Sequence, residues 1–477
     1  MGINIKLNDM SYRYEVYQII NLFHSLEDID FVESDENFYV HIDKDYMEIG
    51  NKDYSKEFQF SKGVPIKEEI KKYIYSYFSK LYGIELPWGT LIGIRPSKIA
   101  LALLKDGYSE KEIIERFQHR NLTKKDKVEL CIEIAKYEEK FINVDKNKVS
   151  IYVGMPFCPT RCLYCSFTSN PIAGNKRLVE PYLNALVREI KEVSSFIKSK
   201  SIEIDTVYFG GGTPTAVDDD NFEYVMKNIY ENLVLDFKVR EFTVECGRPD
   251  SITETKLKSM KRYAVDRISI NPQSMNDDTL KLIGRMHSAK DVIDKFNLAR
   301  RLGFNNINMD IIVGLPGEKV SHMNTTLDMI KSLAPESITV HGLSIKRASR
   351  LYEDLKLNKI YEIADQKELI KMYEATKDTA KELGMIPYYM YRQKNMVGNM
   401  ENVGYSIPGM ECIYNIQMIE EKQTIIAFGA DAVSKVVFLD ENRIERFPNV
   451  KDIREYVNRI DEMIEKKKDL LNTLYNL

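Results

Sequence analysis

Short apolar runs alternate with amphipathic stretches through the middle of the chain, from about residue 149 to residue 345. Between the first two runs, the apolar positions 179, 182, 183, 186, 187, 190 and 193 form one stripe at helical spacing. Strand, helix and strand in series predict a parallel sheet covered by helices. Six such units fit a partial, open (β/α)6 barrel. The predicted strands are residues 150–155, 206–211, 241–246, 267–271, 306–313 and 337–342.

The flanking regions are less regular, and we expect four domains in all. Residues 1–85 are predicted to form a small α+β domain, and residues 86–148 a helical linker region. The barrel occupies 149–345, and an α/β extension on the substrate side occupies 346–477. The elements expected in the first domain are helices at 12–26 and 66–81 and strands at 38–42 and 46–49.

The extension begins with a predicted helix at residue 366 and continues with residues 388–394, then a polar loop rich in Gly, Asn and Met, and then residues 424–432. Its last element, 452–474, has apolar residues at helical spacing throughout. We therefore expect one C-terminal helix that packs against the rest of the domain.

Composition and charge narrow the function classes. The chain is 44% hydrophobic and 29% charged, which is ordinary for a globular protein. Its formal charge of −4 argues against a broad nucleic-acid interface. No apolar run reaches twenty residues, and the N-terminus lacks a signal-peptide core, so we expect no membrane span and a cytoplasmic location.

Three of the six cysteines lie together directly after the first predicted barrel strand. Cys158, Cys162 and Cys165 are spaced so that three thiolates on one loop could hold three corners of a cubic iron–sulfur cluster, with the fourth iron open. The alternatives are a zinc site or structural thiols. Zinc normally recruits a fourth Cys or His, and no His lies between His119 and His287. A disulfide cannot satisfy three cysteines, so the pattern favours the cluster.

Glycine and polar residues follow the later strands, where the active site of a barrel of this kind lies. Gly210-Gly211-Gly212-Thr213 ends the second strand, and glycines there would let the backbone approach a ligand closely. Taken alone, the glycines could form only a tight turn. The polar residues at or near later strand ends are Glu245, Gln273, Arg285 and Asp310.

The spacing CxxxCxxC after the first strand of a βα series resembles the radical S-adenosylmethionine (SAM) superfamily, over roughly residues 150–345. The order of Tyr152, Pro156-Phe157-Cys158, Gly-Gly-Gly-Thr-Pro-Thr, Arg285-Met286-His287 and Gly314-Leu315-Pro316 is similar to the oxygen-independent coproporphyrinogen III oxidase (coproporphyrinogen dehydrogenase) family. Ile94-Arg95-Pro96 and Tyr391-Arg392-Gln393 resemble its HemZ branch.

The resemblance implies a radical-SAM barrel in which a [4Fe–4S] cluster and SAM are the cofactors. Cys158, Cys162 and Cys165 would ligate the cluster, and these three with Tyr152 would be catalytic. SAM would bind the open iron. The expected SAM contacts are Tyr152, Gly211, Gly212, Thr213, Glu245, Gln273, Arg285 and Asp310.

The implied reaction is oxidative decarboxylation of coproporphyrinogen III, a tetrapyrrole with four carboxylates, in haem biosynthesis. It needs an electron donor such as flavodoxin or ferredoxin. Fixed cations should bind the carboxylates, and the candidates are Arg347, Arg350, Arg392 and Lys394.

Two departures from the oxidase pattern widen the choice of function. Phe167 stands where the oxidases have a further cysteine, and Gly154 stands where they have a histidine. Both changes occur among relatives with other roles. A haem chaperone of the HemW type and a radical SAM methyltransferase or ring-opening enzyme acting on haem are therefore alternatives.

Overall fold

The computed structural model describes residues 2–24, 29–167, 170–357 and 359–475, which form two compact units. One unit contains Met1–Lys136 and Met390–Asn402, and the other contains Tyr137–Tyr389 and Val403–Leu477. The ranges expected for four domains stay a prediction. Residues 25 and 26 of the expected first helix lie outside the described residues. No helix in the described ranges has the length and apolar character needed to cross a membrane.

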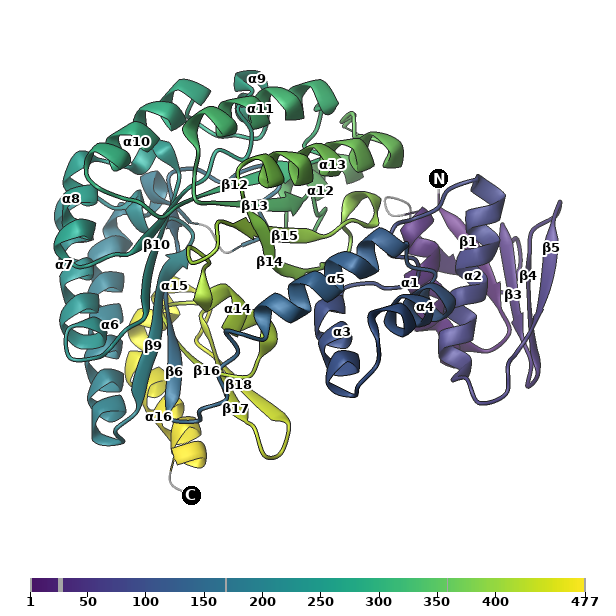
Figure 1. Ribbon diagram of the computed structural model, residues 1–477, viewed down its shortest axis with the longest axis horizontal. Coiled ribbons are helices and arrows are strands. Elements are labelled where there is room, and N and C mark those ends of the chain that lie inside the picture. Colours follow the sequence, from purple (N-terminus) through teal and green to yellow (C-terminus); the bar gives the residue numbers. More distant parts are fainter. Residues whose placement is uncertain (1, 25–28, 168–169, 358, 476–477) are drawn as a thin grey trace. The chain divides into compact units, whose positions relative to one another are not determined.

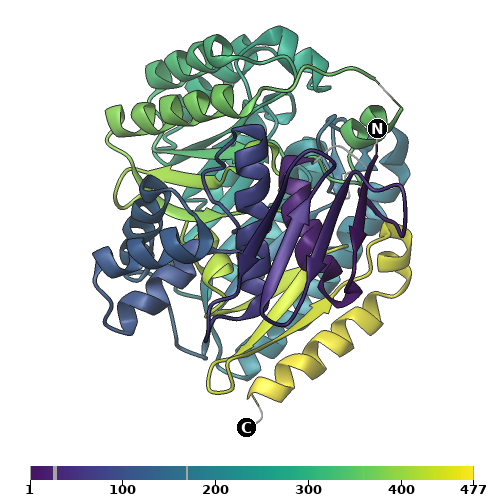
Figure 2. The ribbon, with the colours of Figure 1, turned by 90° about the vertical axis from the view of Figure 1, so that its right-hand side faces the viewer.

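A five-stranded sheet forms the centre of the first unit (Figure 2, purple). Its strand order is β2-β1-β3-β4-β5, with parallel pairs around β1 and antiparallel pairs from β3 to β5. The strands are β1 (Ile3–Leu7), β2 (Ile29–Phe31), β3 (Phe38–Ile42), β4 (Tyr46–Gly50) and β5 (Ser55–Gln59).

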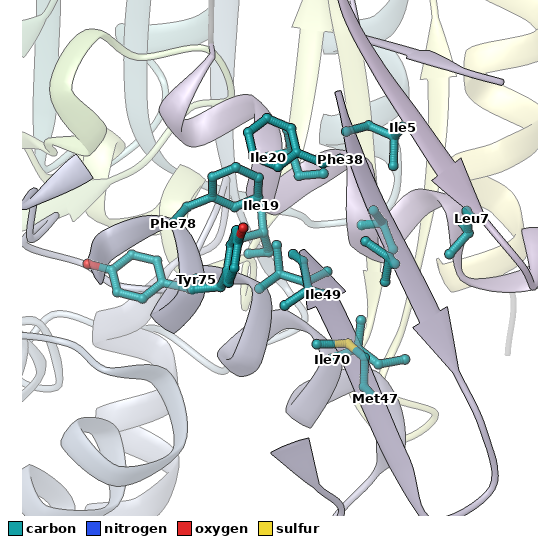
Figure 3. Packing of buried hydrophobic residues seen from close by; sticks show 14 of the residues in the cluster. Ile5, Leu7, Ile19, Ile20, Phe38, Met47, Ile49, Ile70, Tyr75 and Phe78 are labelled. Atoms are coloured by element: carbon teal, nitrogen blue, oxygen red, sulfur yellow. The ribbon is translucent and has the colours of Figure 1, made fainter. Parts of the chain in front are cut away.

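Two helices, α1 (Arg13–Phe23) and α2 (Ile66–Tyr82), supply the other half of this core. Alternate residues of β1 and β3 are buried, as expected for a sheet with one covered face. In Figure 3, Ile19 and Ile20 of α1 and Ile70 of α2 lie among strand residues of the same buried cluster. The expected helices and strands of this region are therefore present, and the structure adds β1, β2 and β5.

Three further helices follow in sequence, as expected for the region after residue 86. They are α3 (Pro96–Lys105), α4 (Glu110–Asn121) and α5 (Lys125–Glu138). Ser109 begins α4 with a capping box, in which its side chain and that of Glu112 bind each other's backbone N–H groups.

An eleven-stranded sheet organises the second unit (Figure 1). The six expected barrel strands lie side by side and run parallel, in the order β13-β12-β11-β10-β9-β6. Over the described residues the strands form an open row, which confirms the expected partial barrel. The six are β6 (Lys148–Met155), β9 (Glu203–Gly211), β10 (Glu241–Gly247), β11 (Arg267–Ile270), β12 (Ile307–Val313) and β13 (Ser337–Gly342).

Helices cover the outer side of these strands, as Figure 1 shows. The first, α6, buries the apolar stripe that the sequence predicts and begins several residues earlier than expected. The covering helices are α6 (Ile172–Ser199), α7 (Asp219–Ile229), α8 (Glu254–Arg262), α10 (Ala289–Arg301) and α11 (Val320–Leu333).

The C-terminal strands continue the same sheet at both of its ends. At one end, β16 (Thr424–Phe428) pairs in parallel with β6, so seven consecutive strands are parallel. Every residue of β16 is buried, as is typical of a parallel strand. At the other end, β15 (Asn402–Ser406) runs antiparallel to β13. The remaining strands are β14 (Ile386–Tyr391), β17 (Val433–Phe438) and β18 (Arg443–Pro448).

Five more helices lie in this part of the described chain. The expected single helix at 452–474 is two helices, α15 (Ile453–Asn458) and α16 (Ile460–Tyr475), because Arg459 leaves the helical conformation with φ −113° and ψ 23°. Figure 2 shows α16 (yellow) beside the β17–β18 hairpin. The others are α12 (Arg350–Lys356), α13 (Gln366–Glu382) and α14 (Ile413–Glu420).

Candidate functional site

The three clustered cysteines lie on the loop that follows β6, at the carboxyl edge of the parallel sheet. Cys158 belongs to the two-residue strand β7 (Phe157–Cys158), which pairs with β8 (Asn170–Pro171). Cys158 and Cys162 are buried, and Cys165 is partly exposed. The loop is held by hydrogen bonds from the Leu163 N–H to the Ile283 carbonyl (2.9 Å) and from the Thr160 hydroxyl to the Gly284 carbonyl (2.9 Å).

The thiols are close enough to affect one another's ionisation. Burial, together with the neighbouring thiols of Cys165 and Cys162, raises the pKa of Cys158 to about 12, although a hydrogen bond from Thr213 over 3.5 Å acts against this rise. A buried thiolate here needs compensating positive charge, which bound iron supplies.

The donor set is three thiols on one loop. Each cysteine of a [4Fe–4S] cluster binds a different iron, and three thiols on one loop fit three corners of such a cluster. Among the described residues, no group of three His, Cys, Asp or Glu side chains is placed to hold a single metal ion.

The glycine turn at the end of β9 packs directly against the cysteine loop. Thr213 donates its backbone N–H to the Phe157 carbonyl over 2.8 Å. A Cβ atom on Gly212 would lie 2.6 Å from that carbonyl oxygen and 2.9 Å from the Cys158 sulfur. Gly211 has φ +105°, a conformation that side chains disfavour. Glycine is therefore required here for the close approach of the turn to the cysteine loop, and close approach to a ligand stays a prediction.

Two expected SAM contacts, Glu245 and Asp310, occupy neighbouring positions in the barrel. Burial, together with the charge of Asp310, raises the pKa of the Glu245 carboxyl to about 7. Burial would also raise the pKa of Asp310, but interactions with His341 and hydrogen bonds from Asn308 and Thr339 hold it below its ordinary value. Asn308 donates from Nδ2 to Asp310 Oδ1 over 2.6 Å. The pair thus combines one carboxylate with one carboxyl that gains a proton near neutral pH.

Gln273 and Arg285 each carry a buried polar atom with no hydrogen-bond partner in the described part of the chain. Gln273 has φ +66° and donates its backbone N–H to the Asp310 carbonyl over 2.9 Å, while its Oε1 is unpaired. Arg285 donates from Nη1 to the Asn271 carbonyl (2.8 Å) and from Nη2 to the Tyr164 hydroxyl (3.3 Å), while its Nε is unpaired. Buried polar groups are normally paired, so these atoms fit a polar ligand such as SAM.

A stack of three tyrosines lies beside Glu245, whose carboxyl accepts a hydrogen bond from Tyr208. Tyr152 of β6 and Tyr208 of β9 are register partners, and the ring of Tyr414 from α14 lies 4.6 Å from that of Tyr208 and 6.2 Å from that of Tyr152, measured between ring centroids. The stack places the expected Tyr152 within the barrel. Tyr208 and Tyr414 were not expected at the site. Tyr414 could not be placed from the sequence, because only the fold brings α14 to this point.

Two cations beside the cysteine loop were also missed. Arg248 follows β10 and donates from Nη1 to the Thr160 hydroxyl (2.8 Å) and the Cys162 sulfur (3.7 Å). Burial lowers the pKa of Lys346, while the charge of Cys165 acts in the opposite direction. The position of Arg248 three residues after Glu245, at a strand end, was the available sequence signal.

The expected substrate cations are divided between the two units. Arg347 and Arg350 are exposed, on a segment bound to the cysteine loop through the Leu351 N–H and the Leu163 carbonyl (2.9 Å). In the first unit, Arg392 is buried and donates to the carbonyls of Leu91, Asn399 and Met400.

Lys394, also in the first unit, donates to the Tyr14 hydroxyl over 3.1 Å. The structure therefore brings Arg347 and Arg350 to the cysteine loop. A substrate role for any of the four cations stays a prediction.

Known proteins resemble this chain in sequence. Residues 152–330 match the sequence model of the Radical SAM superfamily. The chain is 40% identical to the oxygen-independent coproporphyrinogen-III oxidase-like protein HemZ of Bacillus subtilis (strain 168), over 87% of this chain and 84% of that protein. It is 30% identical to the heme chaperone HemW of the same organism, over 66% of this chain and 76% of that protein.

A solved structure is similar in fold. Coproporphyrinogen III oxidase (HemN) from Escherichia coli, described as a radical SAM enzyme, aligns with a TM-score of 0.53 and 19% identity, over 69% of this chain and 72% of that one. At this identity the likeness concerns the fold alone.

Proposed function

We propose that this chain, which belongs to the radical SAM superfamily and, within it, to the family of HemZ-type coproporphyrinogen-III oxidase-like proteins, converts coproporphyrinogen III to protoporphyrinogen IX by oxygen-independent oxidative decarboxylation. The expected family resemblance is confirmed. The family uses a [4Fe–4S] cluster and SAM. When bound and reduced, these cofactors supply a 5′-deoxyadenosyl radical that removes hydrogen from a substrate carbon.

The protein's own residues have distinct parts in this proposal. Cys158, Cys162 and Cys165 hold the cluster, and the glycine turn keeps the backbone against it. Tyr152, Gly211, Gly212, Thr213, Glu245, Gln273, Arg285 and Asp310 are the proposed SAM contacts.

One observation carries the cofactor part: three thiols share a loop, and the unpaired atoms Gln273 Oε1 and Arg285 Nε are buried near the ends of neighbouring strands. Arg285 also contacts the cysteine loop, because its Nη2 donates a hydrogen bond to the Tyr164 hydroxyl. A guanidinium in this place is suited to a carboxylate, such as that of the methionine part of SAM.

Substrate binding needs cations for the four carboxylates of coproporphyrinogen III. Arg347, Arg350 and Lys346 meet this need beside the cysteine loop. The electron enters from a donor such as flavodoxin or ferredoxin. Cys165 is partly exposed, which gives such a donor the shortest approach to the loop.

A haem-binding chaperone is the second candidate, because the chain is 30% identical to HemW over three quarters of that protein's length. In that case haem would be bound without turnover. His341 is partly exposed, but its Nε2 lies 3.6 Å from Asp310 Oδ2, which favours a structural part for this histidine over haem ligation.

Product analysis separates these functions. The reconstituted protein would be incubated without oxygen with SAM, dithionite and either coproporphyrinogen III or haem. We expect protoporphyrinogen IX from the first substrate, with two 5′-deoxyadenosine molecules for the two vinyl groups. Stoichiometric haem binding with no tetrapyrrole product would support the chaperone, and methylated or ring-opened haem would support a haem-modifying enzyme. A variant with Cys158, Cys162 and Cys165 replaced by Ala is the control.

A further inference from the structure

Arg248 makes a set of contacts at the cysteine loop that the proposed cofactor contacts leave unexplained. Its guanidinium is 3% exposed and lies between the loop and the carboxylate of Asp250. Nη1 faces the loop, where it donates to the Thr160 hydroxyl over 2.8 Å and to the Cys162 sulfur over 3.7 Å. The contact to sulfur is direct, from a full positive charge to a proposed cluster ligand.

Asp250 fixes this orientation from the other side. Arg248 donates from Nε to Asp250 Oδ1 (3.0 Å) and from Nη2 to Asp250 Oδ2 (2.8 Å), a bidentate pair in which the planar fork cannot rotate freely. His287 also faces this carboxylate, with its Nδ1 3.8 Å from Asp250 Oδ1. Because Nε and Nη2 bind Asp250, the guanidinium faces the cysteine loop with Nη1.

Two of the three cysteines accept hydrogen bonds from donors of different charge. Cys158 accepts from the neutral hydroxyl of Thr213 over 3.5 Å, whereas Cys162 accepts from a cation. Hydrogen bonds to the sulfur ligands and nearby charge are the main ways in which a protein sets the reduction potential of an iron–sulfur cluster. A reduced cluster has one more negative charge than an oxidised one, so a buried cation stabilises the reduced form more strongly.

We propose that Arg248 is a positioning residue that, held by Asp250, donates an N–H to the Cys162 thiolate and makes the cluster easier to reduce. The inference rests on the cluster in the proposed function and is independent of the substrate. A purely structural Arg248 would tie Thr160 to Asp250 and leave the potential unchanged.

The test is an EPR-monitored redox titration of reconstituted protein without SAM. Iron content and the EPR signal of the reduced cluster are recorded first: protein with no cluster would count against the proposed function itself. In R248Q, we expect the ratio of reduced to oxidised cluster at a fixed potential to fall at least tenfold. This fall corresponds to a midpoint potential of the cluster about 59 mV more negative than in the wild type.

Arg300 offers a matched control, since it pairs with Glu336 over 2.7 Å at the far end of β12 from the loop. R300Q should have the wild-type midpoint. A loaded R248Q protein with the wild-type midpoint would overturn the inference.

A spectroscopic measurement on the wild type tests the inference even if a variant cannot hold the cluster. Protein labelled with 15N-arginine should give a nitrogen coupling to the reduced cluster in pulsed EPR. The coupling should persist in R285K and, wherever R248K is loaded, be lost there. A wild-type spectrum with no arginine coupling, or a coupling lost only in R285K, would overturn the role of Arg248.

Discussion

Tyr208 donates its hydroxyl hydrogen to Oε2 of Glu245 over 3.2 Å, between the neighbouring parallel strands β9 and β10. Gly210 makes this contact possible, since a Cβ there would lie 2.6 Å from the Tyr208 ring and 2.7 Å from Glu245 Oε2. The carboxyl is therefore enclosed by a ring, a glycine backbone and Asp310. Burial and the charge of Asp310 raise the pKa of Glu245, whereas the hydrogen bond from Tyr208 acts in the opposite direction.

The first prediction concerns stability against pH. In the folded protein Glu245 keeps its proton to about pH 7, whereas in the unfolded chain it loses it near its ordinary pKa of 4.5. Between these values the unfolded state binds fewer protons, so the contribution of Glu245 to stability is complete below pH 4.5 and is lost as pH rises to about 7. The rise in pKa corresponds to about 3 kcal/mol at most.

E245Q removes this titration and should therefore gain stability relative to wild type as pH increases. We expect its melting temperature, measured without SAM, to rise relative to wild type between pH 5 and pH 8. An equal difference between the two proteins at both pH values would refute the assignment of this pKa.

The second prediction concerns the glycine turn. In G212A, the new methyl group would lie 2.6 Å from the Phe157 carbonyl oxygen and 2.9 Å from the Cys158 sulfur, so the cysteine loop must move. Iron content after reconstitution should fall well below the about four irons per chain of a full cluster. G174A is the matched control, because a Cβ at Gly174 in α6 meets no atom within 4 Å. Wild-type iron content in G212A would contradict the close packing.

The third prediction separates ligand cysteines from packing cysteines. Single replacements C158A, C162A and C165A should each abolish stable cluster binding, as measured by iron, sulfide and visible absorbance. C246A and C131A should keep the cluster, because Cys246 and Cys131 are buried among apolar neighbours and lie 3.8 Å and 3.9 Å from methionine sulfurs. Loss of iron in C246A at wild-type stability would mean that the ligand set is wrong.

The fourth prediction concerns the attachment of the C-terminal helices. Glu189 of α6 is fully buried and accepts hydrogen bonds from the Gly429 N–H (2.9 Å), Asn449 (2.9 Å), the Tyr456 hydroxyl (2.6 Å) and Lys467. K467M leaves this carboxylate without its cation, which should reduce the free energy of unfolding by about 3–5 kcal/mol.

The neighbouring pair of Lys468 and Glu192, 2.9 Å apart and more exposed, is the control. K468M should change stability by less than about 1 kcal/mol in urea unfolding. Similar effects of the two replacements would show that burial of the Glu189 pair does not matter.

The barrel was predictable because its strands are apolar runs and its chemistry follows their ends. The cysteine loop, the glycine turn and Glu245 are local in sequence, so periodicity and motif spacing were enough to locate them. Pairing of β16 with β6 links residues more than 270 positions apart, and no local pattern records it. The break at Arg459 was hidden because the apolar spacing continues through it.

The positions of charged residues in the sequence were the weakest guide to which side chains lie at the site. Arg392 looked like a free cation, yet its donors bind main-chain carbonyls. The sequence did not single out Arg248, and only the fold places it 3.7 Å from the Cys162 sulfur. Tyr414 lies more than 200 positions after Tyr208 in the sequence, and only the fold stacks the two rings.

The measurement that tests the central claim most directly is the yield of 5′-deoxyadenosine from SAM. Protein reconstituted without oxygen to about four irons per chain would be reduced with dithionite in the presence of SAM and coproporphyrinogen III. We predict more than one 5′-deoxyadenosine per chain from the wild type and none from C162A. Protein that carries the full cluster and releases no 5′-deoxyadenosine would contradict the account.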